Sequence, residues 1–305
     1  MNKLLKHRPV VFFNGYDSYL LASGEKGCGN FEKIGKEDIS LSINELNGYD
    51  EMRLSALVSV SSKSPFINKG DRYNMGTEGK NHQKSGFIVG QVGARFEKQG
   101  FMDCQDCLIY PKQNIPANGY GPDSTESRSN FLLSWAKMWG LNNNFPVYDE
   151  SLKSDESYKL LSIVKDTFLN KAVYKARIRM LADVLLLEAS TRATQTNELA
   201  YVHIVGLGLG VWEIDTTQHS LYVDAWIDSL RGLPKSATSH LHTLNFSWIN
   251  KKLIENLADD NKCLKTGVTI VFSRRNLHDP VPDGCFLICN YAWDSNSAPG
   301  TLFIF

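Results

Sequence analysis

The stretch 200–212 reads Ala200-Tyr201-Val202-His203-Ile204-Val205-Gly206-Leu207-Gly208-Leu209-Gly210-Val211-Trp212. Its first half, Tyr201 to Val205, is apolar and β-branched, which predicts a buried strand. Glycines then occupy three alternate positions, and a helix-like segment follows from about Thr216. In α/β proteins this order forms a phosphate site, because glycines let backbone N–H groups approach an anion and the helix start adds donors and a positive dipole end. The stretch therefore favours an α/β fold with a nucleotide-like ligand at Gly206, Gly208 and Gly210.

Two better-known phosphate loops fit this stretch less well. The dinucleotide fingerprint has its third glycine one residue later and an acidic residue about 20 positions on, at a strand end. Here Trp212 replaces the small residue, and Asp224 and Asp228 fall inside the predicted helix. A P-loop is excluded because no Gly-Lys-Ser/Thr follows. A nicotinamide-dependent oxidoreductase is thus a weaker alternative, and a tight structural turn is the other interpretation.

Strands and helices alternate from about residue 154 onward, which is typical of a layered α/β sheet. The first 150 residues are more irregular and are expected to add strands and loops to one edge. The predicted strands are Val10–Phe13, Leu54–Val60, Gly86–Phe96, Cys107–Tyr110, Tyr201–Val205, Leu244–Ile249, Val268–Phe272 and Cys285–Ala292, with a long loop at 61–84. The predicted helices are Ser129–Trp139, Ser154–Arg192 (capped by Ser154 or Asp155), Thr216–Arg231 and Asn250–Ala258.

Composition limits the function classes. The 305 residues carry 33 basic and 33 acidic side chains, so no global field favours a nucleic acid or an anionic membrane as partner. No apolar run approaches the roughly 18 residues that span a bilayer. The apolar part of the N-terminus is shorter than a signal-peptide core of about 7–15 residues. We expect a cytoplasmic protein, or a secreted effector that acts in a host cytosol.

The cysteines do not form a recognisable zinc or disulfide pattern. Cys104-x-x-Cys107 lacks a second pair at matching spacing, since Cys285 and Cys289 lie in an apolar strand. We therefore expect free, structural thiols and no bound metal.

A second candidate site follows the last predicted strand, at Asn290-Tyr291-Ala292-Trp293-Asp294-Ser295-Asn296-Ser297-Ala298-Pro299-Gly300. Ligands of open α/β sheets bind outside the carboxyl ends of the strands. Asn290, Asp294 and Asn296 would hold ribose hydroxyls there, and Trp293 would stack. The alternative is a polar turn whose Asp and Asn side chains bond their own backbone.

Three weaker candidates remain. Asp279 lies in a Pro/Asp/Gly segment that is most simply a turn, although its carboxylate could face the site. Arg95 adds a cation in the N-terminal half, with a solvated loop end as the alternative. His203 lies in an apolar strand and is expected to be a core histidine.

Four segments together resemble the MavL-type, macrodomain-related proteins. They are Val92–Glu97, His203–Trp212, Asn245-Phe246-Ser247-Trp248 and Tyr291–Gly300, in the family's order, and the resemblance runs from about residue 70 onward. It implies a three-layer α/β/α macrodomain-like fold with a mixed sheet and an N-terminal elaboration. One domain would cover 1–305, with an irregular part at 1–150 and an α/β core at 151–305.

The resemblance also implies ADP-ribose or an ADP-ribosylated protein as partner, and removal of ADP-ribose from protein side chains as activity. The three glycines would cradle the diphosphate, and Asn290, Asp294 and Asn296 would line the distal ribose. Breaking the bond at ribose C1 builds oxocarbenium character, which a carboxylate such as Asp294 stabilises without a metal or cofactor.

The chain departs from the family pattern at two places. After Pro299-Gly300 the family continues into Asn-Glu and an aromatic residue, whereas this chain reads Thr301-Leu302-Phe303-Ile304-Phe305, and Asn245 stands where relatives tend to carry Asp. A changed loop would affect hydrolysis more than binding. The alternative function is therefore a non-catalytic ADP-ribose-binding module.

Overall fold

The computed structural model describes residues 11–13, 16–18, 49–70, 76–96, 99–253 and 267–292. At its centre lies a six-stranded sheet in the order β10-β9-β8-β11-β4-β3. Its strands are β3 (Val60–Pro65), β4 (Ser85–Gln91), β8 (Leu199–Val205), β9 (Leu241–Ser247), β10 (Thr269–Ser273) and β11 (Cys285–Ala292). Five strands run parallel, and only β3 is antiparallel to its neighbour, at one edge. The five parallel strands therefore end at the same side of the sheet.

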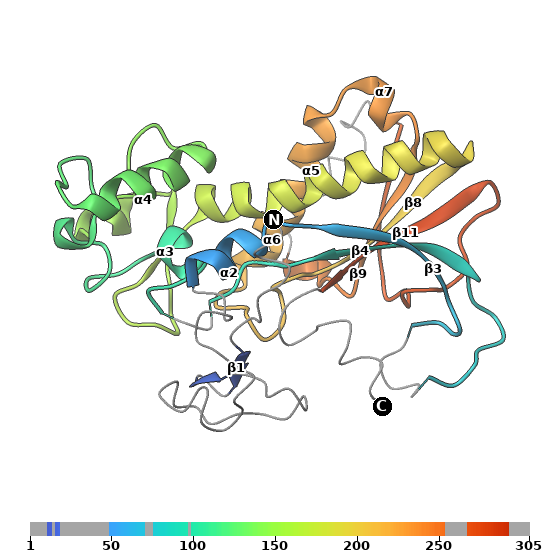
Figure 1. Ribbon diagram of the computed structural model, residues 1–305, viewed down its shortest axis with the longest axis horizontal. Helices are drawn as coiled ribbons and strands as arrows, with labels where there is room; N and C mark the ends of the chain where they lie inside the picture. The colour runs from blue at the N-terminus through green and yellow to red at the C-terminus, as the bar shows by residue number, and fades with distance from the viewer. Residues whose placement is uncertain are drawn as a thin grey trace, which may run out of the picture.

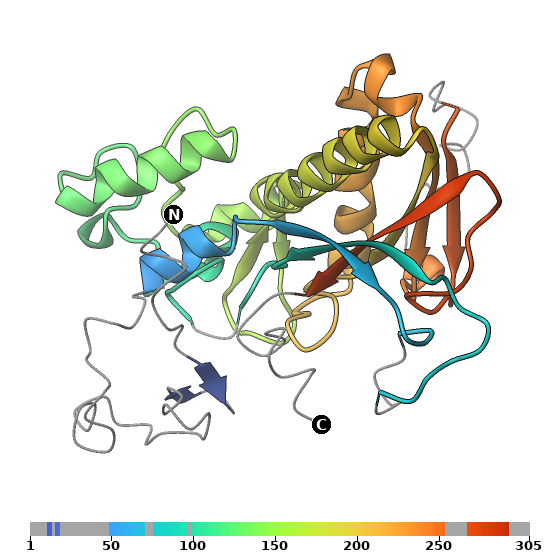
Figure 2. The same ribbon diagram turned by 45° about the vertical axis from the view of Figure 1, so that its right-hand side comes forward.

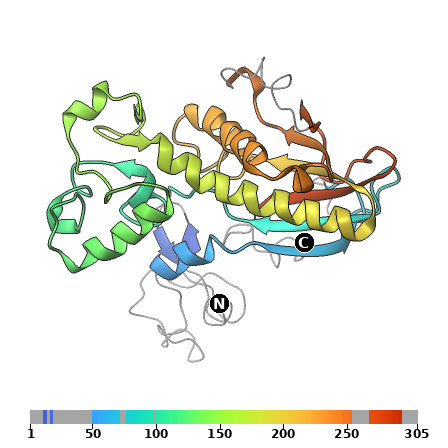
Figure 3. The ribbon, with the colours of Figure 1, turned by 90° about the horizontal axis from the view of Figure 1, so that it is seen from above.

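Two long helices, α5 (Lys171–Thr196) and α6 (Thr217–Gly232), pack side by side over one face of this sheet (Figures 1 and 3). Alternate strand residues such as Val202 and Ile204 point toward them and belong to the main hydrophobic cluster. α5 begins at Lys171 because the Asn170 side chain accepts a hydrogen bond from the N–H of Val173 at 3.2 Å.

The opposite face of the sheet is covered differently. Segment 274–284 runs from the carboxyl end of β10 to the amino end of β11, and His278 on it stacks on Phe66 with ring centroids 3.6 Å apart. Beneath them Tyr201 and Leu287 form a small apolar cluster with Phe66. The described residues therefore place helices over one face of the sheet and irregular chain over the other. The mixed α/β sheet is confirmed, while the three-layer, macrodomain-like arrangement stays a prediction.

A second group of elements lies beside the sheet, at the left of Figure 1. It contains α2 (Tyr49–Ser55), α3 (Cys104–Cys107), α4 (Ser127–Met138), and a three-stranded antiparallel sheet of β5 (Leu108–Ile109), β7 (Phe168–Asn170) and β6 (Tyr158–Leu160). Arg53 on α2 joins this group together, because it pairs with the buried carboxylate of Asp106 and lies 3.9 Å from the ring centre of Trp135. Trp139 donates to the same carboxylate at 2.9 Å. We call this group the helical lobe.

The remaining short elements complete the described chain. They are the hairpin of β1 (Val11–Phe13) and β2 (Tyr16–Ser18), the 3-10 turns η3 (Pro116–Asn118), η4 (Glu150–Ser154) and η5 (Lys251–Leu253), and α7 (Lys235–Thr238).

Most sheet strands lie where the sequence predicts them, and β4 and β3 extend one edge as expected. Two predictions are wrong. The helix predicted from Ser154 begins only at Lys171, because β6, a turn and β7 occupy 158–170. The strand predicted at Leu54–Val60 is the end of α2 and a turn, and β3 occupies the start of the predicted loop at 61–84. β3 is polar because it is an exposed edge strand.

Cys104, Cys107, Cys285 and Cys289 are free and buried, as predicted, whereas Cys28 and Cys263 lie outside the described residues. Burial raises the pKa of the Cys289 thiol to about 12. Among the described helices, none combines the length and the apolar character needed to cross a bilayer.

Candidate functional site

Two loops meet at the carboxyl side of the sheet. The glycine loop, defined as Gly206–Trp212, follows β8, and a second loop, Val92–Phe96, follows β4. β11 pairs with both β4 and β8, so its carboxyl end at Ala292 opens between the two loops. Figure 2 shows the glycine loop beside the tip of β11. These two loops are the segments that the sequence singles out in the N-terminal and C-terminal halves.

The two loops touch backbone to backbone. A Cβ on Gly93 would lie 2.5 Å from the carbonyl carbon of Leu207 and 2.7 Å from the nitrogen of Gly208. Gly208 in turn has φ +84, and a Cβ there would lie 3.0 Å from the Ala94 oxygen. Glycine is required at both positions, because a side chain at either would push the loops apart.

A buried ion pair fixes the loop after β4. Arg177 on α5 bonds the Asp103 carboxylate at 3.0 Å and the Val92 carbonyl at 2.8 Å. The other oxygen of Asp103 accepts from the N–H of Arg95 at 2.7 Å. Arg177 and Asp103 are both buried, so their mutual charges and these backbone groups satisfy one another away from water. No local sequence pattern predicts this pair, since its members are 74 residues apart.

The glycine loop uses only part of its own hydrogen-bonding capacity. The N–H groups of Leu207 and Leu209 bond to the carbonyls of Val205 and Gly206, at 2.9 and 3.0 Å. The N–H groups of Gly208 and Gly210 make no such bond within the described residues. Among the described residues, a Cβ on Gly210 would meet nothing within 4 Å, so this part of the loop faces open space in the part of the chain that the structure describes. Backbone donors in that position suit an anion.

The start of α6 does not contribute donors in the way the sequence pattern predicts. The Asp215 carboxylate accepts from the Thr217 N–H at 2.9 Å, and the Gln218 side chain accepts from the N–H groups of Ile214 and Asp215. The helix therefore caps itself, and its dipole end is already matched by a carboxylate. An anion at this edge would rely on the glycine loop.

Asn290 lies on β11 and is fully buried. Its side-chain oxygen accepts from the Val205 N–H at 2.7 Å, and its amide nitrogen lies 3.3 Å from the Val205 carbonyl. Tyr222 of α6 donates to that same carbonyl at 2.8 Å. In this structure Asn290 thus supports Val205, the residue just before the glycine loop, and its contact with a ligand stays a prediction.

The other candidates are distributed over three places. Arg95 is buried on the loop that contacts Gly208, so it lies near the glycine loop. Asp279 lies on segment 274–284, where its carboxylate accepts from the Asn276 N–H at 2.9 Å, as the turn interpretation expects. Trp293, Asp294 and Asn296 lie outside the described residues.

A polar network that the sequence analysis missed lies on the face of the sheet opposite α5 and α6. Arg275 donates to Nδ1 of His203 at 2.9 Å and lies over the ring of Tyr201 at 4.9 Å. Asn245 links the Tyr201 hydroxyl at 2.7 Å to the Ser273 hydroxyl at 2.8 Å. Burial and the neighbouring guanidinium lower the pKa of His203 to about 3, so its ring is neutral. His203 is thus a core histidine, as predicted, but one bonded to a cation.

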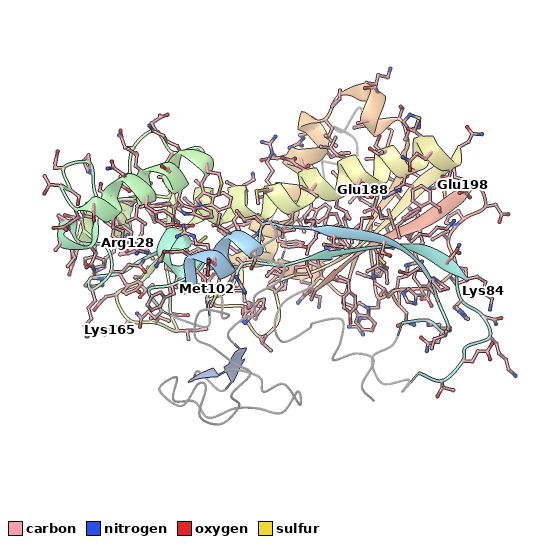
Figure 4. The ribbon with its side chains drawn as sticks, viewed as in Figure 1. Lys84, Met102, Arg128, Lys165, Glu188 and Glu198 are labelled. Atoms are coloured by element: carbon pink, nitrogen blue, oxygen red, sulfur yellow. The ribbon has the colours of Figure 1, made fainter. Side chains whose placement is uncertain are left out.

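Two cavities in the described residues lie elsewhere. One of about 250 Å³ is lined by Glu198, Leu199 and Gly284, at the amino ends of β8 and β11. Figure 4 shows Glu198 and Lys84 at that end of the sheet, and Arg128, which lines the second cavity of about 490 Å³, in the helical lobe. Within the described residues, no three His, Cys, Asp or Glu side chains gather to hold a metal ion.

Comparison with known proteins gives the family of this chain. A family model described as "ADP-ribosylhydrolase MavL-like" matches residues 1–305. The chain is 32% identical over 321 residues to ADP-ribosylarginine hydrolase CG2909 of Drosophila melanogaster, covering 99% of this chain and 63% of that protein. It is 33% identical over 318 residues to ADP-ribosylarginine hydrolase CG3568 of the same organism, covering 99% of this chain and 62% of that protein. The chain thus spans about six tenths of the length of these relatives, and it belongs to the MavL-like ADP-ribosylhydrolase family.

Proposed function

We propose that this chain hydrolyses the bond between ADP-ribose and an arginine side chain of a modified protein. The observation that carries the proposal is the pair of loops at the carboxyl edge of the sheet, where Gly93 and Gly208 bring two backbones together. Membership of an ADP-ribosylhydrolase family supports the reaction class, and the names of the two Drosophila melanogaster relatives support arginine as the linkage.

The diphosphate of ADP-ribose would lie against the glycine loop. The N–H groups of Gly208 and Gly210 are its donors, since their neighbours Leu207 and Leu209 bond within the loop. Because Gly210 faces open space, a phosphate can approach its backbone without displacing a side chain. Arg95 would add positive charge on the other side of the edge.

The distal ribose would then lie toward the end of β11, between the two loops. Hydrolysis breaks the bond between ribose C1 and a guanidinium nitrogen; the nitrogen leaves with a proton, and water adds to C1 and loses one. Asp294 follows Ala292, the last residue of β11, by two positions. We assign to it the stabilisation of positive charge at C1, or the orientation of water and of the ribose hydroxyls.

The test is Asp294→Ala with Asp283→Ala as its matched control. Asp283 is an exposed carboxylate just before the amino end of β11, at the opposite side of the sheet. We expect Asp294→Ala to stop the release of ADP-ribose from an arginine-modified protein while calorimetry still detects ADP-ribose binding, and Asp283→Ala to behave as the wild type. Unchanged turnover in Asp294→Ala contradicts the assignment. Binding without release in the wild type favours the non-catalytic module instead.

A further inference from the structure

The cavity of about 490 Å³ in the helical lobe has no part in the proposed function. Its volume lies in the range of ligand pockets, about 300–1,000 Å³. Segments 99–105 and 110–113, the turn η3 with the residues after it, and the start of α4 surround it. The side chains of Tyr110, Gln113 and Tyr120 are buried at its base, whereas Ala117 and Arg128 are exposed at its rim (Figure 4). The cavity is therefore open to solvent above a buried floor.

The floor of the cavity carries one donor and one acceptor that no described residue uses. The Tyr110 hydroxyl makes no hydrogen bond among the described residues, and burial raises its pKa above the ordinary value, so the hydroxyl keeps its proton. Gln113 donates its amide hydrogens to the carbonyls of Cys104 and Leu108, at 2.9 and 2.8 Å. Its buried Oε1 has no partner in that part of the chain. Because buried polar atoms are nearly always paired, this floor suits a polar ligand.

The charges around the cavity balance, which decides the class of ligand. Lys112 and Arg128 are cations, Glu126 is an acid, and the Asp50 carboxylate lies 3.7 Å from the Arg128 guanidinium. A nucleotide or a nucleic acid would need an excess of positive charge that these side chains do not supply. A peptide group is uncharged, and its one C=O and one N–H match the donor and the acceptor on the floor. A polypeptide chain therefore fits this cavity better than a nucleotide does.

The cavity and the candidate site share one segment of chain. Gly100 and Phe101 line the cavity, and Arg95, five residues before Gly100, lies on the loop that contacts the glycine loop. Asp103 follows the wall residue Phe101 by two positions, and its carboxylate accepts from the Arg95 N–H at 2.7 Å. Five residues reach at most about 18 Å, so an extended peptide of about five residues spans the distance from Arg95 to the cavity.

We propose that this cavity binds an extended segment of the ADP-ribosylated target protein, a few residues along the chain from the modified arginine. The inference rests on the proposed function, because it takes the position of that arginine from it. The Tyr110 hydroxyl donates to a backbone carbonyl of the target, and a backbone N–H of the target donates to Oε1 of Gln113. The rings of Phe101 and Tyr120 contact an uncharged side chain of the same segment. The cavity thereby favours modified protein over ADP-ribosyl-arginine as substrate.

Three substrates of increasing length measure the contribution of the cavity. They are ADP-ribosyl-arginine, a peptide with two residues on each side of the modified arginine, and a peptide with eight residues on each side. The flanks contain only serine, alanine and tyrosine, so they add no charge. The readout is the length gain, defined as kcat/KM for the long peptide divided by kcat/KM for ADP-ribosyl-arginine. Of the three substrates, only the long peptide reaches the cavity.

Two variants alter the cavity in different ways, each with a matched control. Tyr110→Phe removes the hydroxyl and keeps the buried ring, and Tyr158→Phe on β6 is its control in the same lobe, outside the cavity. Ala117→Trp fills the cavity from its exposed rim. Its control is Ser134→Trp, at an exposed position on α4 that does not line the cavity. Thermal unfolding of each variant monitors the fold.

We expect the wild-type kcat/KM to be much the same for ADP-ribosyl-arginine and the short peptide, and higher for the long peptide. Tyr110→Phe should lower the length gain by about 2- to 12-fold, which corresponds to one hydrogen bond. Ala117→Trp should remove the gain, and the two controls should keep it. Because docking is the same in ground and transition states, the loss should appear in KM rather than in kcat.

A wild type without a length gain, or a gain that Ala117→Trp leaves intact, overturns the docking proposal while leaving the hydrolase proposal standing. No release of ADP-ribose from any of the three substrates by the wild type contradicts the proposed function instead. In that case fluorescence anisotropy of the unmodified long peptide still tests the cavity. Binding that Ala117→Trp abolishes supports the docking site, and absence of binding to the wild type refutes it.

Discussion

Replacing Gly93 by alanine tests whether the contact between the two loops organises the site. A Cβ at residue 93 would lie 2.5 Å and 2.6 Å from the carbonyl carbon and oxygen of Leu207, and 2.7 Å from the Gly208 nitrogen. Carbon atoms prefer separations of about 3.5–4.0 Å, so about 1 Å of movement is needed. The new neighbours are backbone atoms, which cannot rotate away as a side chain can.

The glycine loop is the partner that moves. The loop after β4 is held by the Arg177 bond to the Val92 carbonyl and by the Asp103 bond to the Arg95 N–H, both of which are buried. Overpacking of this kind costs about 1–3 kcal/mol of unfolding free energy. A catalytic group or substrate displaced by about 1 Å costs up to roughly 100-fold in rate.

The assay compares Gly93→Ala with Gly210→Ala. Among the described residues, a Cβ on Gly210 meets nothing within 4 Å, so Gly210→Ala is the control for stability, while its methyl group would still face the proposed phosphate. Denaturant unfolding should show a loss of stability for Gly93→Ala alone, and kcat/KM for ADP-ribose release should fall for Gly93→Ala relative to the wild type. Equal stability of the two variants, or a wild-type kcat/KM for Gly93→Ala, would refute the argument that the loop contact shapes the site.

Two further predictions concern strain and pH. Gly208 and Gly140 share a φ of +84, but within the described residues a Cβ meets a neighbour only at residue 208, the Ala94 oxygen at 3.0 Å. We therefore expect Gly208→Ala and Gly140→Ala each to lose about 1–2 kcal/mol of unfolding free energy from the left-handed backbone, and Gly208→Ala to lose more, as measured by urea unfolding. Because the pKa of His203 falls from 6.5 to about 3 on folding, the folded state binds fewer protons, so stability is full above pH 6.5 and falls as the pH drops toward 3. From pH 7 to pH 5 this linkage lowers the unfolding free energy by about 2 kcal/mol. In His203→Asn the amide oxygen can still accept from Arg275, and the unfolding free energy should fall less steeply with decreasing pH than in the wild type. An identical slope in the two proteins would contradict the neutral, buried histidine.

The strands and the glycine loop were predictable because their signals are local. The apolar run of β8 and the glycines after it stand together in the sequence, and the strand that precedes Trp293 is mostly apolar, with Asn290 as its polar residue. Their meeting with the loop after β4 was not predictable, because Gly93 and Gly208 are far apart in the chain and nothing in either segment indicates the other.

The errors have equally specific causes. Leu160, Leu161 and Phe168 recur near helical spacing, but they lie in and beside β6 and β7, and the true helix signal is the Asn170 cap. Periodicity over a few apolar residues does not distinguish a short hairpin from a helix. The polar network around Arg275 also left no pattern, because an arginine whose side chain bonds to carbonyls of its own loop looks like any surface cation in the sequence.

The bond from Arg177 to the Val92 carbonyl has a consequence for the order of folding. The two residues are 85 positions apart, so this bond closes only after α5 has packed on the sheet. Closing long loops is the slow, entropically costly part of assembly, whereas a helix forms quickly from local contacts. The edge that holds the two loops should therefore gain protection from amide exchange late during refolding, after the α5 and α6 layer. The proposed anion site would then be one of the last parts of the chain to form.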